Sequence, residues 1–329
     1  GSIANMTALS SARAAISPNA WEDGSPEDLV VMGPSTAHYS ILRALSIMGM
    51  GKKSFVPIPV DENEVIITST LEEIYVQVKK EGKRVMALVA NACATSTGLF
   101  DPLEEMAVFC KKHKLWFHVD GAHGAVALLS NKHRQKVKGI EKADSIIWDA
   151  HKMLRVPALC TAVLYKKQEQ MWNSFHQKGS YVFHENEVIG MDSMPFTVEC
   201  TKSALGTKLF WSFAMEGQEA IVKFIENSFQ QAQNLYNYLK SQEDFYCPYP
   251  PQSNILCFQY RPHIVNDQKQ LALRYKLINS GEFYITSCLI HGKRYLRTVM
   301  MNPLTDINDY KALSSAIAKY ALTIKTDEN

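Results

Sequence analysis

Two short stretches of the chain, FHVDGAHG (residues 117–124) and SIIWDAHK (residues 145–152), follow the same pattern. Each begins with apolar residues that are typical of a buried strand, and each ends abruptly in small and ionisable residues. In an open α/β sheet, the carboxyl ends of the strands meet at the mouth of the binding crevice. We therefore expect the carboxylate of Asp120 and the amine of Lys152 to face one crevice.

Around these stretches, apolar segments alternate with amphipathic segments. The alternation predicts an α/β fold with a mostly parallel sheet and helices on both faces. Asp101 and Pro102 suit the start of a helix, with Asp101 as its cap. Pro57 indicates an edge of the sheet or the end of a strand. The expected strands cover residues 29–32, 54–58, 84–90, 115–119, 145–148 and 158–165, and the expected helices cover residues 4–16, 37–48, 71–80 and 101–114.

The pattern changes after about residue 209. It then predicts a small α+β domain in which a turn at His291 and Gly292 joins two strands into an antiparallel hairpin. We expect a large domain over residues 1–210 and a small domain over residues 211–329. The expected helices of the small domain cover residues 216–240, 268–279 and 307–322, and its strands cover residues 255–260, 283–289 and 295–301.

The composition is that of an ordinary globular protein, with 46% hydrophobic and 21% charged residues, which allows one large domain and one smaller domain. The net charge of +2 gives no reason to expect nucleic acid or an anionic membrane as a partner. No apolar run approaches the ~20 residues that span a bilayer. Seven scattered cysteines, several of them within apolar runs, predict reduced core thiols and a cytoplasmic location.

A carboxylate and a lysine at two strand ends suit a site for pyridoxal phosphate (PLP). The lysine forms a Schiff base with this cofactor, and the carboxylate keeps the pyridine nitrogen protonated so that the ring accepts electrons. His118, Asp120 and His123 are open to another interpretation as metal ligands, since the first two share one face of a strand. Because no cysteine pair or second cluster supports a metal, we expect none.

Several motifs of the chain resemble, in family order, those of the group II PLP-dependent decarboxylases, which act on glutamate, aromatic amino acids, cysteine sulfinate or diaminobutyrate. The stretches WDAHKML (148–154) and ALCTAVL (158–164) are most similar to the bacterial L-2,4-diaminobutyrate decarboxylase branch. The resemblance, which extends to about residue 305, implies the PLP-dependent transferase fold type I with a seven-stranded type of sheet between helices. It also implies that the N-terminal part of the family fold is missing from this chain.

The resemblance further implies which residues surround the PLP ring. Lys152, in the family's Asp-x-His-Lys context, would carry the Schiff base, and Asp120 would hold the pyridine nitrogen. Ala122 would pack its methyl group beneath the ring, and His38 would stack on the other face. Taken alone, the residues leave two alternatives open: Asp120 as a strand-end cap, and His38 as a capping or surface histidine.

GSIAN (residues 1–5) resembles the family's Gly-Ser-x-Ala-Asn phosphate loop at a helix N-terminus, where free backbone N–H groups and the helix dipole attract anions. Gly1 and Ser2 would therefore contact the cofactor phosphate, together with His151. Thr95 falls where the family has a threonine of its Gly-Thr-Thr motif. The departure at ACATSTG (92–98) leaves open which hydroxyl serves the cofactor, and Thr95 is the better placed one.

Two further roles follow from the resemblance. Tyr181 lies 29 residues after Lys152, in a polar, glycine-containing stretch typical of a mobile loop. The family has a loop tyrosine at this distance that protonates the carbanion after CO₂ leaves. Arg297 would meet the substrate carboxylate, a task that suits its bidentate geometry; the alternative is an exposed strand arginine.

We therefore expect a PLP-dependent α-decarboxylase of a small L-amino acid, with 2,4-diaminobutyrate as the first choice and aspartate or glutamate next. Aminotransferase chemistry on the same fold and a truncated, non-catalytic module remain as alternatives. The resemblance implies a homodimer with active sites at the subunit interface. The expected partner is the small-molecule substrate, with no nucleic acid and no membrane.

Overall fold

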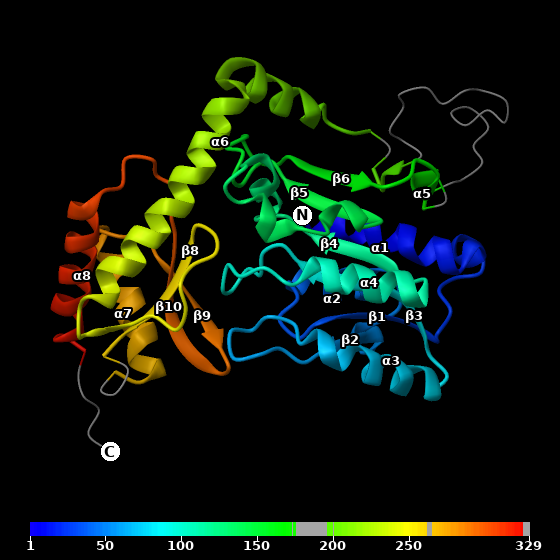
Figure 1. Cartoon of the computed structure of the whole chain (residues 1–329), viewed down its shortest axis with the longest axis horizontal. Helices are drawn as coiled ribbons and strands as arrows, with labels where there is room; N and C mark the ends of the chain where they lie inside the picture. Colours follow the sequence, from blue (N-terminus) through cyan, green and yellow to red (C-terminus); the bar gives the residue numbers. More distant parts are fainter. Residues whose placement is uncertain (173, 176–195, 200, 262–264, 325–329) are drawn as a thin grey trace.

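The computed structural model describes residues 1–172, 174–175, 196–199, 201–261 and 265–324 of the chain. Within these residues the larger sheet has six strands, in the order β2-β1-β3-β4-β5-β6 (Figure 1). The first five strands of this order are parallel, and β6 runs antiparallel to β5. The mostly parallel sheet is thus confirmed, with six described strands where the resemblance implied seven. The strands are β1 (Leu29–Pro34), β2 (Phe55–Ile58), β3 (Arg84–Asn91), β4 (Trp116–Asp120), β5 (Ser145–Asp149) and β6 (Thr161–Tyr165).

Helices cover both faces of this sheet, which explains why its central strands are continuous apolar runs. Along β1, Val30 and Met32 pack into the core that α3 and α4 share. Leu29 and Val31 point the other way, into the core that α1 and α2 share. The helices are α1 (Ser2–Ile16) and α2 (Tyr39–Ile47) on one face, and α3 (Leu71–Lys80) and α4 (Leu103–His113) on the other.

The two stretches that predicted the crevice form neighbouring parallel strands. His118 of β4 lies opposite Ser145 of β5, and Asp120 lies opposite Ile147. Both strands end on a carboxylate, Asp120 in β4 and Asp149 in β5. The parallel pairing therefore brings Asp120 and the turn that carries Lys152 to the same edge of the sheet, as expected.

One expected helix start is wrong in detail. Asp101 does not cap α4; the residue at the N-cap is Pro102. The Asp101 carboxylate is instead buried, and it accepts hydrogen bonds from the backbone N–H groups of Asn91 (2.7 Å) and Ile66 (3.2 Å). The Asn91 amide ends β3 and the Ile66 amide lies in the preceding connection, and satisfying these two buried donors takes precedence over capping a helix.

The C-terminal part of the chain forms a second, antiparallel sheet with the order β7-β8-β10-β9, and the predicted hairpin is its β9–β10 pair. The long helix α6 bends at Gly217, whose φ of +76° lies outside the helical range, and it links the two sheets (Figure 1). Since α6 crosses residue 210, the domain boundary there stays a prediction. The remaining elements are α5 (Glu169–Trp172), α6 (Leu205–Lys240), β7 (Phe245–Tyr246), β8 (Ile255–Tyr260), α7 (Asp267–Ser280), β9 (Thr286–Ile290), β10 (Lys293–Val299) and α8 (Ile307–Ala321).

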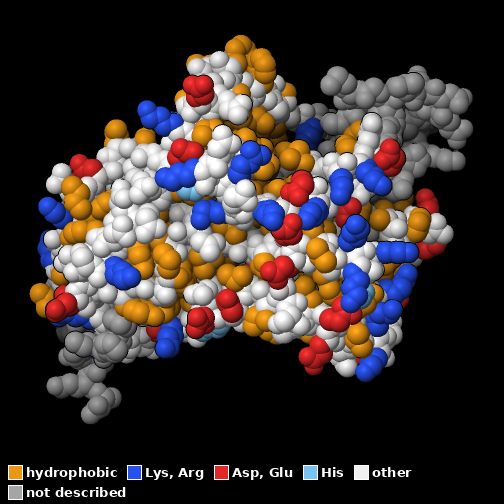
Figure 2. All heavy atoms as spheres, in the orientation of Figure 1, with side chains coloured by type: hydrophobic (Ala, Val, Ile, Leu, Met, Phe, Trp, Pro, Cys, Tyr) orange, Lys and Arg blue, Asp and Glu red, His pale blue; other side chains and the backbone are white. Residues whose placement is uncertain are grey.

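The surface of the first half of α6 carries exposed apolar side chains, which Figure 2 shows at the tip of this helix. Phe210, Trp211 and Met215 are 63%, 57% and 81% exposed. Within the described part of the chain, no helix is both long and apolar enough to cross a bilayer. The six cysteines in that part are free thiols, four of them buried, in line with the expected reduced core.

Close packing near the strand ends yields a first prediction. A Cβ atom on Gly124 would lie 2.5 Å from the backbone nitrogen of Cys93 and 2.8 Å from the carbonyl carbon of Ala92. Gly124→Ala therefore forces the backbone apart, and we expect a loss of roughly 1–3 kcal/mol in the free energy of unfolding. Denaturant titration measures this loss.

The matched control is Gly206→Ala. A Cβ atom on Gly206, within α6, meets no atom within 4 Å, so this variant should keep or slightly exceed the parent stability. Equal stability of the two variants would contradict the packing described around Gly124.

Candidate active site

A cavity of about 250 Å³ lies at the carboxyl ends of β4 and β5, beside the first turns of α1 and α2. A larger hollow of about 740 Å³ surrounds Trp116 and Lys142 at the opposite edge of the sheet, away from both strand ends. The smaller cavity combines a lysine, two carboxylates and two histidines. Its lining residues are Gly1, Ser2, Asn5, His38, Tyr39, Ser40, Cys93, Thr95, Asp120, Ala122, His123, Ile147, Asp149 and Lys152.

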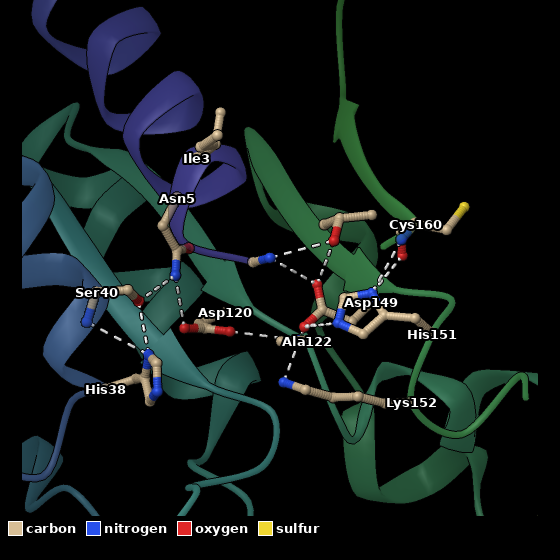
Figure 3. Close-up of polar contacts among 12 residues, drawn as sticks. Ile3, Asn5, His38, Ser40, Asp120, Ala122, Asp149, His151, Lys152 and Cys160 are labelled. Carbon is tan, nitrogen blue, oxygen red and sulfur yellow. Dashed lines mark hydrogen bonds and ion pairs between the residues drawn. The ribbon is translucent and has the colours of Figure 1, made fainter. Parts of the chain in front are cut away.

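Lys152 lies in the turn after β5, where its amine reaches the cavity (Figure 3). The Nζ atom is 2.9 Å from Oδ2 of Asp149, and the lysine side chain keeps 38% of its surface exposed. The amine is thus held by one ion pair while the side chain stays accessible from the cavity.

Asp149 is a site residue that the sequence interpretation did not single out. Its buried carboxylate accepts a hydrogen bond from Oγ1 of Thr161 (2.7 Å), and its Oδ1 lies 3.2 Å from the backbone nitrogen of Gly1. Burial opposes ionisation, but the charge and hydrogen bond of Lys152, with the Thr161 hydroxyl, outweigh it, so that the pKa of Asp149 lies below its usual value. Its position as the last residue of a strand, within the motif quoted for Lys152, was the available signal.

Asp120 is buried and held by two donors. Its Oδ1 accepts from the backbone N–H of Ala122 (3.2 Å), and its Oδ2 accepts from Nδ2 of Asn5 (2.9 Å). An ionised carboxylate has about four acceptor positions, so both oxygens retain capacity for a further donor. Ala122 itself lines the cavity.

His38 caps a helix, as one of its two interpretations allowed, and its stacking on the cofactor stays a prediction. It is the N-cap of α2, where its Nδ1 accepts from the backbone N–H of Ser40 (3.3 Å), and it also lines the cavity. Burial lowers the pKa of His38, with the negative charge of Asp120 opposing this effect. The lowered pKa favours the neutral form of the imidazole.

The first turn of α1 borders the cavity with Gly1 as the N-cap and Ser2 as the first helical residue. A Cβ atom on Gly1 would lie 3.1 Å from Oδ2 of Asp149, so the close approach of this carboxylate favours glycine. Thr95 lines the cavity too. Among its hydroxyl neighbours, Ser96 donates to Glu64 and Thr97 accepts from the backbone N–H of Leu99.

Two predicted site residues, His151 and Arg297, do not line the cavity, and a third is not among the described residues. His151 does not line the cavity; its Nδ1 contacts the backbone of Cys160 (2.8 Å to the carbonyl oxygen), and its Nε2 is 3.7 Å from Asp149. Arg297 donates from Nε to the carbonyl oxygen of Ser96 (3.2 Å), the neighbour of Thr95. Tyr181 lies outside the described residues. The roles expected of these three residues, like those of the residues that line the cavity, stay predictions.

The metal interpretation gains no support from the geometry. His118 contacts Ser145 and Asn5, whereas Nε2 of His123 contacts Asn254 at 2.7 Å. Among the residues that the structure describes, no group of three or more His, Cys, Asp and Glu side chains could hold a metal ion.

The donor set fits PLP. An accessible lysine amine, a buried carboxylate with spare acceptor capacity and a helix N-terminus converge on one cavity. These are the groups that an aldehyde, a pyridine nitrogen and a phosphate require. The fold and the site thus define the class of PLP-dependent proteins with a lysine and an aspartate at adjacent strand ends.

Comparison with known proteins narrows this class. Residues 1–261 match the model of the pyridoxal-dependent decarboxylase conserved domain, and the chain belongs to this family. It is 28% identical over 336 residues to the human acidic amino acid decarboxylase GADL1, covering 96% of this chain and 64% of that protein. It is 32% identical over 266 residues to the L-aspartate decarboxylase dtxS4 of Metarhizium robertsii, covering 80% of this chain and 53% of that protein.

A solved structure shares the fold almost throughout. The apo form of mouse CSAD superposes with a TM-score of 0.90 at 26% identity, covering 98% of this chain and 70% of that chain. Of the two curated relatives, GADL1 and dtxS4, the chain spans less than two thirds of the length. Both are decarboxylases of acidic amino acids by name, so they do not support the expected likeness to the diaminobutyrate branch in particular.

Proposed function

We propose that the protein binds PLP in this cavity and removes the α-carboxylate of a small acidic L-amino acid as CO₂. The observation that carries the proposal is the convergence of Lys152, Asp149 and Asp120 at the ends of two adjacent strands, within one cavity. Family membership supports decarboxylation as the reaction.

PLP, when bound, supplies a ring system that accepts the electron pair left at Cα by the departing carboxylate. Lys152 would hold the cofactor and, with its amine paired to Asp149, would remain oriented while substrate binds. Asp120 would keep a proton on the pyridine nitrogen, because a buried carboxylate favours a cationic donor. His38 would cover one face of the ring and Ala122 the other.

The other predicted residues would act around this centre. Backbone N–H groups at Gly1 and Ser2 would bind the phosphate, with Thr95 and His151 nearby. Tyr181 would return a proton to Cα after CO₂ leaves. Arg297 would bind a substrate carboxylate, and its contact with Ser96 links it to the loop that carries Thr95.

The substrate ranking differs from the one that the sequence favoured. The names of the curated relatives include acidic amino acid, L-aspartate and cysteine sulfinic acid decarboxylases. We therefore place aspartate, cysteine sulfinate and glutamate ahead of 2,4-diaminobutyrate.

A substrate screen tests the proposal. We expect the PLP-loaded protein to release CO₂ and the matching amine from at least one acidic amino acid, at least about tenfold faster than from diaminobutyrate. Mass spectrometry of the products and trapping of CO₂ measure both. Formation of a keto acid without CO₂ would establish the aminotransferase alternative, and PLP binding without turnover of any amino acid would establish the non-catalytic one.

We also propose a homodimer. Exposed apolar side chains in the first half of α6, at Phe210, Trp211 and Met215, are the kind of surface that a partner covers. Sedimentation velocity at micromolar concentration should give twice the chain mass, and a monomer under these conditions would refute the proposal.

A further inference from the structure

A continuous series of hydrogen bonds runs from the interior of the sheet to Asp120. Nε1 of Trp116 lies 2.8 Å from Oγ of Ser145, which lies 2.8 Å from Nδ1 of His118. Nε2 of His118 lies 2.8 Å from Oδ1 of Asn5, whose Nδ2 lies 2.9 Å from Oδ2 of Asp120. The last three side chains come from α1 and β4, and all five are buried.

The direction of each bond follows from chemistry. The amide side that faces the Asp120 carboxylate must be the NH₂ group, so Oδ1 of Asn5 faces His118 and accepts. His118 therefore carries its proton on Nε2, which leaves Nδ1 as an acceptor. The Trp116 indole can only donate. Ser145 therefore accepts a hydrogen bond from Trp116 and donates one to Nδ1 of His118.

The same amide group also fixes which nitrogen of His38 carries the proton, through Ser40. Nδ2 of Asn5 also lies 2.8 Å from Oγ of Ser40, which lies 2.7 Å from Nδ1 of His38. Nδ1 of His38 accepts from the backbone N–H of Ser40 (3.3 Å) and so carries no proton. The Ser40 hydroxyl therefore donates to this nitrogen, and the proton of the neutral imidazole sits on Nε2. Figure 3 shows Asn5 between Ser40 and Asp120, with His38 beyond Ser40.

We propose that Asn5 is a positioning residue whose one amide fixes two groups of the site: Asp120 as a proton-free acceptor, and His38 as the neutral form protonated on Nε2. The inference rests on the proposed function for its catalytic meaning, but its structural content concerns the apo chain alone. His118 holds Asn5 in place through a hydrogen bond and does not itself line the cavity.

The electrostatics of the interior agree with this arrangement. Burial lowers the pKa of His118 to about 4, although the negative charge of Asp120 opposes the shift. His118 thus stays neutral over the pH range in which the protein would work. A protonated His118 would donate from both nitrogens and would leave the Ser145 hydrogen without this acceptor.

Nitrogen NMR of the apo protein labelled with [¹⁵N]histidine tests the assignment without any activity. We expect His118 to show a protonated Nε2 and an unprotonated Nδ1, unchanged from pH 8 to pH 5.5. The signals that disappear from the spectrum of His118→Gln are those of His118. A protonated Nδ1, or a charged imidazole at pH 7, would overturn the proposal even if decarboxylation were demonstrated.

Two variants separate positioning from folding. In Asn5→Asp, two carboxylates meet and must share a proton, so we expect lower thermal stability and at least about tenfold weaker PLP binding, the equivalent of one lost charge-assisted hydrogen bond. Adding Asp120→Asn restores the hydrogen bond between the two positions in the reverse direction: the amide at position 120 donates, and the carboxylate at position 5 accepts. The double variant should regain thermal stability but not PLP affinity.

The matched control is Ser11→Ala, on the same helix. Its hydroxyl is buried and contacts Tyr165 and Ser174, away from the cavity. It should weaken PLP binding less than about twofold. Equal weakening by Ser11→Ala and Asn5→Asp, or recovery of PLP affinity in the double variant, would show that Asn5 serves only the packing of α1.

Discussion

We expect Lys152→Ala to lower the proposed decarboxylation rate by roughly a thousandfold or more and to remove the visible absorbance of the bound cofactor. This is the expected result because Lys152 provides the amine in the cavity that can hold the cofactor covalently. The variant should fold, since the lysine side chain is 38% exposed and its loss leaves no cavity in the core. Absorbance spectra and single-turnover kinetics measure the two effects.

Removing the amine also takes the ion pair with Lys152 from the buried Asp149 carboxylate, although Thr161 still donates to it and the Gly1 nitrogen stays 3.2 Å away. A modest loss of stability should therefore accompany the loss of activity. Lys166→Ala provides the control, since Lys166 is exposed and lies at the opposite edge of the same sheet. Full activity and unchanged absorbance in Lys152→Ala would rule out the site assignment.

Asp120→Asn is expected to lower kcat about 100-fold while the fold is retained. The amide has nearly the shape of the carboxylate but cannot hold a proton on the pyridine nitrogen. A hydrogen bond to a charged group contributes about 1.5–3 kcal/mol, and 1.36 kcal/mol corresponds to a factor of ten in rate. Steady-state kinetics at saturating PLP measures the loss.

Asp101→Asn is the matched control for this variant. Asp101 is as deeply buried as Asp120, but its carboxylate binds two backbone amides outside the cavity. Its replacement should lower the melting temperature and leave kcat within about twofold at a temperature where the protein is folded. If both variants had a lower melting temperature but an unchanged kcat, the catalytic role of Asp120 would be untenable.

Strand ends were predictable from the sequence because their signal is local. An apolar run that stops at Asp120 or before Lys152 defines both the strand and the edge to which it delivers the side chain. Parallel pairing of β4 with β5 then required only the usual connection rules. Pro57 likewise marked the edge strand β2, since a residue without an N–H cannot serve a central ladder.

What the sequence did not predict depends on contacts between distant residues. Asp101 resembles a helix cap locally, but the buried amides of Ile66 and Asn91 decide its role. Asn5 belongs to a quoted motif, yet its contacts with Ser40, His118 and Asp120 exist only after α1 packs on the sheet. No periodicity or spacing encodes such a meeting.

The most direct measurement of the central claim is the position of the cofactor on the chain. The purified, PLP-loaded protein is reduced with borohydride, which fixes the cofactor to its lysine, and the digested peptides are mapped by mass spectrometry. We predict a pyridoxyl group on Lys152 and on no other lysine. A label on a different lysine, or an unlabelled Lys152 in protein that decarboxylates an amino acid, would contradict the account.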